Sequence, residues 1–296
     1  MHEINRREFV SSSLAALGTA AVCGSVQGKE PAGQKLPAVK WGNCQISRLL
    51  VGHNPLKGQS YSSGELDKEM REWFKPDAGH DVELLVRCQQ VGINTCQLGA
   101  ASMEAVLRRF YAGGGKMQWI STFYSKPGKA KDELKRILQM EPKPIGFQQW
   151  GQIGDDLLAA GKIDSLQENM KMLRDTGLLV GLGAHDPRVI EHAEEKGWDV
   201  DFYQCCFYHR RHGKQWNDGE RQRMVKVIGK VSKPCIGFKV LAGNRHTKTP
   251  QDVFDALKLA FDAMKPSDVV LLGMWRKHKD QPGENRELAC KILGAG

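Results

Sequence analysis

The feature that most constrains the fold of this 296-residue chain is an alternation of two kinds of segment, repeated from Lys40 to the C-terminus. Short apolar segments bounded by Gly or Pro predict buried strands, and longer charged segments with apolar residues at helical spacing predict amphipathic helices. We expect strands at residues 47–53, 94–99, 118–124, 145–150, 179–184, 201–208, 235–241 and 269–274. We expect helices at residues 81–91, 103–112, 130–140, 163–175, 187–196, 219–231, 250–264 and 284–293.

Strands that alternate with helices predict a parallel sheet. Eight such units within about 250 residues predict that the sheet closes, so the expected fold class is α/β, a (β/α)₈ TIM barrel. An open, doubly wound sheet is the alternative. Such a sheet usually opens with a G-x-G-x-x-G loop, which this sequence lacks. Gly181 and Gly183 are instead interpreted as points of close backbone packing in the fifth strand.

The N-terminus has the pattern of a twin-arginine export signal. Arg6 and Arg7 are followed by Phe9 and by a weakly apolar run of Ala, Ser and Gly. A basic segment before a short apolar one is typical of a removable leader, although a chance Arg pair before a buried helix is the alternative. We expect cleavage between Val22 and Gly28 and a periplasmic or secreted protein, with lipidation of Cys23 left open. The expected organisation is a signal peptide at 1–28, a linker at 29–39 and the barrel at 40–296.

Composition narrows the classes of partner. Lys and Arg outnumber Asp and Glu by 43 to 34, but they are scattered, so no nucleic-acid interface is expected. No apolar run of about 20 residues follows the leader, so no membrane span is expected. The expected partners are a small-molecule substrate and the twin-arginine export machinery. Seven cysteines follow Cys23, an odd number without a C-x-x-C motif, which indicates buried thiols rather than a disulfide framework.

Residues at the C-terminal ends of the strands are the candidates for chemistry, because a barrel carries its active site at that end. Lys239 is the most informative, since an unpaired lysine buried in an apolar strand costs several kcal/mol. Phe238 and Lys239 are adjacent, so a regular strand can turn only one of them inward, and we expect Lys239 to be inside or paired with a carboxylate. The candidate catalytic residues are His53, Tyr124, His185, Tyr208 and Lys239.

Four segments carry a resemblance to a known family: residues 92–97 (GINTCQ), 177–185 (GLLVGLGAH), 238–243 (FKVLAG) and 273–285 with its Glu-Asn turn. In order and texture they resemble the second, fifth, seventh and eighth strands of aldo/keto reductases, and in particular a secreted, divergent branch. The resemblance implies an NADP cofactor: Gln204 would hold the nicotinamide amide and Phe238 would stack on its ring. Adenine and the 2′-phosphate would be bound by Arg276, Lys277, Lys279, Glu284 and Asn285.

The catalytic residues of the family do not carry over. Its Asp, Tyr, Lys and His fall on Gln97, near Ser102, on Thr122 or Phe123, and on Trp150. Carbonyl reduction needs a proton donor near the reacting carbon, which Tyr124, His53, His185 or Tyr208 would have to supply.

Three functions remain open. The first is an oxidoreductase with rebuilt catalytic residues that acts on a small polar, sugar-like substrate. The second is a lyase, isomerase or hydrolase that uses His53, His185, His209 and Lys239, and the third is a non-catalytic ligand-binding protein. Imidazoles at strand ends suit zinc, but no H-x-H or H-E-x-x-H motif occurs, and Cys205 and Cys206 point to opposite faces of a strand. No metal is therefore assigned.

Overall fold

A computed structural model describes residues 35–209 and 218–294, all within the unit formed by residues 33–296. The expected leader at 1–28, with Arg6, Arg7 and Cys23, lies outside the described residues and stays a prediction. Among the described helices, none is long and apolar enough to cross a membrane.

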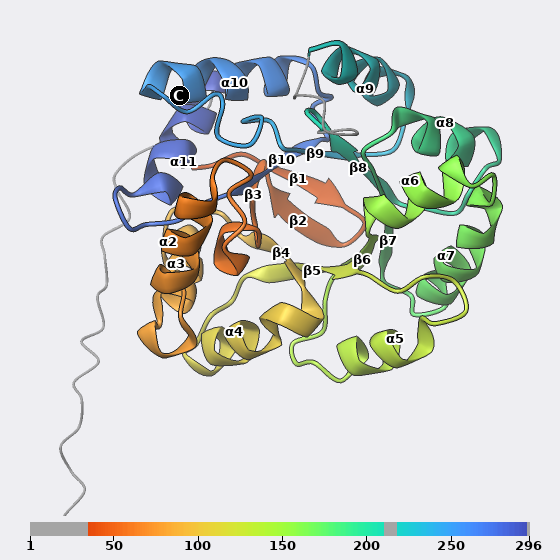
Figure 1. The fold of residues 1–296 in the computed structure, drawn as a ribbon, viewed down its shortest axis with the longest axis horizontal. Coiled ribbons are helices and arrows are strands. Elements are labelled where there is room, and N and C mark those ends of the chain that lie inside the picture. Colours follow the sequence, from red (N-terminus) through yellow and green to blue (C-terminus); the bar gives the residue numbers. More distant parts are fainter. Residues whose placement is uncertain (1–34, 210–217, 295–296) are drawn as a thin grey trace, which may run out of the picture. The chain divides into compact units, whose positions relative to one another are not determined.

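Eight parallel strands close into a barrel in the order β10-β3-β4-β5-β6-β7-β8-β9 (Figure 1). This confirms the predicted (β/α)₈ fold. The strands are β3 (Leu49–Gly52), β4 (Thr95–Gly99), β5 (Gln118–Phe123), β6 (Gly146–Gln149), β7 (Leu179–Ala184), β8 (Phe202–Cys206), β9 (Cys235–Phe238) and β10 (Val269–Gly273). Each lies within one of the eight predicted ranges, and most are shorter because the ends of those ranges belong to loops.

Helices surround the barrel (Figure 1). They are α2 (Gly64–Trp73), α3 (His80–Gln90), α4 (Ala100–Ala112), α5 (Lys131–Leu138), α6 (Gly151–Ala159), α7 (Gln167–Arg174), α8 (Pro187–Glu195), α9 (Asp218–Lys230), α10 (Pro250–Asp262) and α11 (Gln281–Ile292). The eight predicted helices are present, whereas α2 and α6 were not predicted. In α8, Asp186 caps the N-terminus through the Arg188 amide and Pro187 takes the first helical position, as the sequence indicates.

A hairpin that the sequence did not predict precedes the barrel. It pairs β1 (Ala38–Trp41) with β2 (Cys44–Ser47), so the expected linker at 29–39 ends inside β1, and Ser47 belongs to the hairpin rather than to the first barrel strand. The Trp41 indole packs 5.2 Å from the Phe202 ring and donates a hydrogen bond to the Ser267 carbonyl at 2.9 Å. The hairpin thus covers one end of the barrel.

Side chains fill the barrel in layers, because alternate strand residues face inward. The layer beneath Trp41 is apolar and contains Leu50, Ile120, Phe202 and Ile236. At Gly181 a Cβ atom would overlap the Phe202 ring, so glycine is required there. Two residues further along the same strands, Gly52, Thr122, Gln204 and Phe238 line a cavity at the opposite end. The strand period therefore separates an apolar floor from a polar mouth.

The seven cysteines of the described residues are free, and six of them are buried. This confirms the expectation of buried thiols.

Candidate active site

A cavity of about 310 Å³ opens at the C-terminal ends of the strands, where barrel enzymes carry their chemistry. Nine of the residues proposed from the sequence line it: His53, Tyr124, His185, Gln204, Phe238, Lys239, Lys279, Glu284 and Asn285. Three do not: Tyr208, Arg276 and Lys277. The C-terminal ends of the predicted strands therefore locate the cavity correctly, but some of the residues proposed there lie beside the cavity rather than in its lining.

The inner wall of the cavity is a layer of uncharged polar groups. The buried Gln97 amide nitrogen lies 2.8 Å from Gln204 Oε1, 3.1 Å from Gln148 Oε1 and 3.1 Å from Thr122 Oγ1. Its own oxygen, Oε1, is buried without a hydrogen-bond partner. A buried acceptor without a donor costs about 1–3 kcal/mol. Gln97 is therefore prepared to accept a hydrogen bond from a ligand hydroxyl or amide.

His53 and Tyr124 form a hydrogen-bonded pair at the cavity wall. His53 Nδ1 donates to the Gln97 carbonyl at 3.2 Å, because a carbonyl can only accept. In this tautomer Nε2 accepts the Tyr124 hydroxyl at 3.1 Å. Burial, together with the positive charge of Lys57, lowers the pKa of His53 to about 4. The imidazole is therefore neutral near pH 7, and its Nε2 lone pair accepts the hydrogen bond of the Tyr124 hydroxyl.

The Tyr124 ring is held from several sides. Its backbone amide donates to Glu133, and the ring meets Trp150 edge-on at 5.3 Å. At Gly99 a Cβ atom would lie 2.7 Å from the Tyr124 hydroxyl oxygen, so only glycine leaves room for this rotamer. Burial raises the pKa of Tyr124 above its ordinary value, which keeps the hydroxyl protonated. The position of the phenol is therefore fixed by packing.

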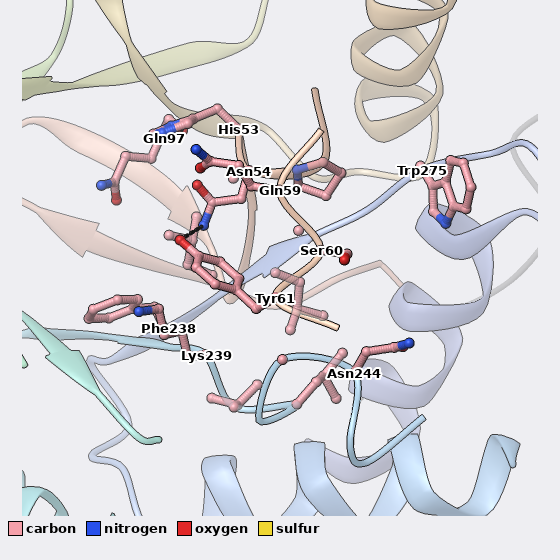
Figure 2. Close-up of a pocket in the computed structure, with 18 of the residues that line it drawn as sticks. His53, Asn54, Gln59, Ser60, Tyr61, Gln97, Phe238, Lys239, Asn244 and Trp275 are labelled. Atoms are coloured by element: carbon pink, nitrogen blue, oxygen red, sulfur yellow. Dashed lines mark hydrogen bonds between the residues drawn. The ribbon is translucent and has the colours of Figure 1, made fainter. Parts of the chain in front are cut away.

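Phe238 and Lys239 both line the cavity, so the expectation that only one of them could do so was wrong. Strand β9 ends at Phe238, and Lys239 has a left-handed backbone with φ of 57°, which breaks the alternation. The Lys239 ammonium lies 4.9 Å from the centre of the Tyr61 ring, on the loop before α2, and Asn54 donates to the Tyr61 hydroxyl (Figure 2). Tyr61 was missed because no strand or motif precedes it.

His185 is oriented by a carboxylate. Its Nδ1 lies 2.7 Å from Asp155 Oδ2, while Asp155 Oδ1 accepts the backbone amides of His185 and Asp186 at 3.2 and 3.0 Å. The ring stacks on His209 at 4.3 Å. Cys206, the last residue of β8, lies close by: one ligand atom from each of His185, Cys206 and His209 falls within 4.8 Å of the others. Among the described residues, His53 does not join this group.

Tyr208 lies two residues beyond the end of β8 and turns toward α9. Its hydroxyl donates to Asp218 at 3.4 Å, and its ring contacts Arg221 and His246. The sequence predicted a strand as far as residue 208, and its earlier end is the reason that Tyr208 lies outside the cavity lining.

The positions proposed for a dinucleotide fit in part. Gln204 and Phe238 lie on neighbouring strands and line the same cavity as Glu284 and the buried Asn285. The three cations proposed for the 2′-phosphate are instead paired with carboxylates of the chain. Arg276 lies 3.7 Å from Asp280, Lys277 2.6 Å from Glu69 and Lys279 2.7 Å from Glu284.

Comparison with solved structures places the chain among α/β barrels. It is similar to the glycerol dehydrogenase AKR11B4 from Gluconobacter oxydans, with a TM-score of 0.57 and 12% identity over 87% of this chain and 94% of that one. It is also similar to the thermostable aldo-keto reductase Tm1743, with a TM-score of 0.52 and 13% identity over 87% and 98%. A dihydropteroate synthase from Xanthomonas albilineans has a TM-score of 0.49, with 10% identity over 88% and 97%.

At these identities the likeness concerns the fold alone. No protein-family model and no curated protein sequence matches the chain.

Proposed function

We propose that this protein is an oxidoreductase that interconverts an alcohol and a carbonyl group on a small, uncharged, hydroxylated molecule, with a nicotinamide dinucleotide as cofactor. The observation that carries the proposal is the Tyr124–His53 pair at the wall of the barrel-mouth cavity. It supplies the proton donor and acceptor that such a reaction requires. The pair would take the place of the family's tetrad, whose four positions hold other residues here.

The proposed proton path runs through two hydrogen bonds. When an alcohol is oxidised, the Tyr124 oxygen accepts the hydroxyl proton of the substrate as Tyr124 passes its own proton to His53 Nε2. The resulting imidazolium keeps its Nδ1 hydrogen bond to the Gln97 carbonyl, which offsets part of the cost of charging a buried ring, and it then gives its proton to water. In the reduction direction Tyr124 donates its hydroxyl proton to the oxygen of the substrate carbonyl, and a proton from water restores the phenol, because His53 is neutral near pH 7. The nicotinamide ring, when bound, would exchange a hydride with the substrate carbon.

The substrate class follows from the polar layer beneath this pair. Gln97, Thr122, Gln148 and Gln204 offer amide and hydroxyl groups but no charge. Such groups bind sugar-like hydroxyls, whereas a carboxylate or an ammonium against this layer would find no counter-ion within it.

For the dinucleotide, Gln204 and Phe238 would hold the nicotinamide, and Glu284 and Asn285 the adenine. We propose a weak preference for the NADP form through Lys279. Its pair with Glu284 is about half exposed, with side chains 47% and 45% accessible, and an exposed pair of this kind contributes only about 0–1 kcal/mol. A 2′-phosphate can therefore displace Glu284, but Arg276 and Lys277 lie outside the cavity lining and add little.

Isothermal titration of the protein with NAD⁺ and NADP⁺ tests the cofactor. We expect binding of both, with less than about tenfold preference for NADP⁺, which corresponds to 1.4 kcal/mol. Phe238→Ala should weaken binding, whereas Tyr208→Phe, outside the cavity lining, should not. No heat with either dinucleotide at millimolar concentration would refute the redox function.

A second experiment tests the proton donor. A panel of polyols and sugars is offered with each dinucleotide, and the absorbance of the reduced nicotinamide is followed. Tyr124→Phe should lower kcat by about 10²–10⁴-fold with a substrate that the parent protein turns over. Turnover by Tyr124→Phe at the parent rate would show that another group moves the proton.

We also propose that the protein is exported by the twin-arginine system. The pattern around Arg6 and Arg7 supports this. Replacing both by Lys should leave the precursor in the cytoplasm, as measured by fractionation. Normal export of the double variant would contradict it.

A further inference from the structure

We propose that His185, Cys206 and His209 form a binding site for a Zn²⁺-like divalent cation at the edge of the barrel-mouth cavity. This goes beyond the redox function, because neither the Tyr124–His53 pair nor the dinucleotide positions use Cys206 or His209. One ligand atom from each of the three residues falls within 4.8 Å of the other two. Small side-chain rotations would bring these atoms to the bond lengths of about 2.0–2.3 Å that zinc makes with nitrogen and sulfur.

The barrel topology brings the three residues together. His185 follows the last residue of β7, and Cys206 ends the neighbouring strand β8. Alternation turns Cys206 to the interior with Gln204 and leaves Cys205 on the opposite face. His209 comes three residues later and stacks on the His185 ring at 4.3 Å. Cys205 and Cys206 therefore do not bind one metal together, as the sequence predicts, but the sequence analysis did not consider that Cys206 could join two histidines.

Asp155 is a hydrogen-bond acceptor of the kind that a metal-binding histidine ordinarily has at its second ring nitrogen. It accepts the Nδ1 hydrogen of His185 at 2.7 Å, which leaves Nε2 as the ligand atom. The His185 and Asp155 side chains are only 9% and 10% exposed, and two backbone amides hold the carboxylate in place. A carboxylate bound to the outer nitrogen of a ligating histidine fixes the ring and increases its basicity.

The local charge also favours a cation. Among residues 35–209 and 218–294, Asp155 and Glu220 place two negative charges within electrostatic range of Cys206, and Lys239 places one positive charge there. Metal binding converts the Cys206 thiol to a thiolate, which adds a third negative charge. The two histidines and the cysteine supply three ligands, so a tetrahedral cation would keep a fourth position for water or a ligand. Catalytic zinc sites have such an open position, whereas structural zinc sites do not. Because His185 lines the cavity, that position would lie at the cavity wall.

Metal content tests the site without any assay of turnover. The full-length protein is dialysed against micromolar Zn²⁺, then against metal-free buffer, and zinc is measured by mass spectrometry. We expect about one zinc per chain in the parent. We expect the same in Cys205→Ala, a matched control in which an equally buried thiol is lost on the other face. Cys206→Ala should retain no more than background.

Co²⁺ substitution gives an independent readout of the ligand type. The parent and Cys205→Ala should develop a near-ultraviolet sulfur-to-cobalt charge-transfer band, and Cys206→Ala should not. Asp155→Asn should keep the band but weaken affinity by about 10–100-fold. If Cys206→Ala does not fold, as judged by circular dichroism, His209→Gln serves in its place and should also lose the zinc. A parent without zinc, or a Cys206→Ala or His209→Gln variant that binds zinc as tightly as the parent, would overturn the proposal.

Discussion

The buried pair at the cavity wall predicts how stability responds to acid. Folded His53 has a pKa of about 4, whereas the unfolded chain has the ordinary value of 6.5. Above pH 6.5 both states are neutral at this residue and its contribution is constant. As the pH falls from 6.5 toward 4, the unfolded chain binds a proton that the folded protein does not, so stability is lost.

The size of the loss follows from these two values. At pH 5 the pKa of His53 in the unfolded chain is 1.5 units above the pH, and each unit corresponds to about 1.4 kcal/mol. Protonation of this one residue in the unfolded chain therefore lowers the free energy of unfolding by about 2 kcal/mol. Urea unfolding followed by tryptophan fluorescence at pH 7 and pH 5 measures the difference. The carboxylates of the chain add their own pH dependence, which is common to the parent and to a His53 variant and cancels in the comparison.

His53→Gln should remove this loss, because glutamine does not titrate and can still accept the Tyr124 hydroxyl. His278→Gln is the control, since that side chain is 61% exposed, and it should behave like the parent. If the parent and His53→Gln lose the same stability between pH 7 and pH 5, then His53 is not held neutral and the proposed proton path loses its acceptor.

Three other changes test the packing around the site. Gly99→Ala should lower the free energy of unfolding by about 1–3 kcal/mol, because the new Cβ presses on the Tyr124 ring, and an unchanged urea midpoint would contradict this. Asp186→Ala should lower the free energy of unfolding by about 1 kcal/mol through loss of the α8 cap, while Asp186→Asn should retain most of the stability that the cap contributes. Lys239→Met should change stability by less than about 1 kcal/mol, since the ammonium lies beside the exposed Tyr61 ring, yet weaken dinucleotide binding in titration, because Lys239 lines the cavity next to Phe238, the ring proposed to stack on the nicotinamide. Equal binding by the parent and Lys239→Met would assign Lys239 no role at the cavity.

The eight barrel strands could be predicted because strands buried on both faces are continuous apolar runs between turn residues. The elements that were missed carry a weaker signal. Helix α2 buries one residue, Met70. Helix α6 begins with Gly151 and contains Gly154, and glycine disfavours helix. At Gly151 a Cβ atom would lie 3.0 Å from the backbone of β7, so tight packing selects the residue against its local propensity.

The site could be predicted as far as topology determines it. His53, Tyr124 and His185 follow strands, and parallel strands bring their ends to one rim. The conformation of Lys239 could not be anticipated, because a left-handed backbone is unusual for lysine and depends on the loop that follows. The positions of Cys206 and His209 beside His185 depend on the register between β7 and β8, which no local pattern in the sequence encodes.

The hydrogen bond between Trp41 and Ser267 joins residues 226 positions apart in the chain. At synthesis rates of about 5–20 residues per second, the hairpin would leave the ribosome roughly 10 to 45 s before its partner. During that interval the apolar side chains of Trp41 and Ile46 have no barrel to cover and stay in contact with water. Burial of the Trp41 indole therefore has to wait until the segment that contains Ser267 has been made and the ring of strands has closed.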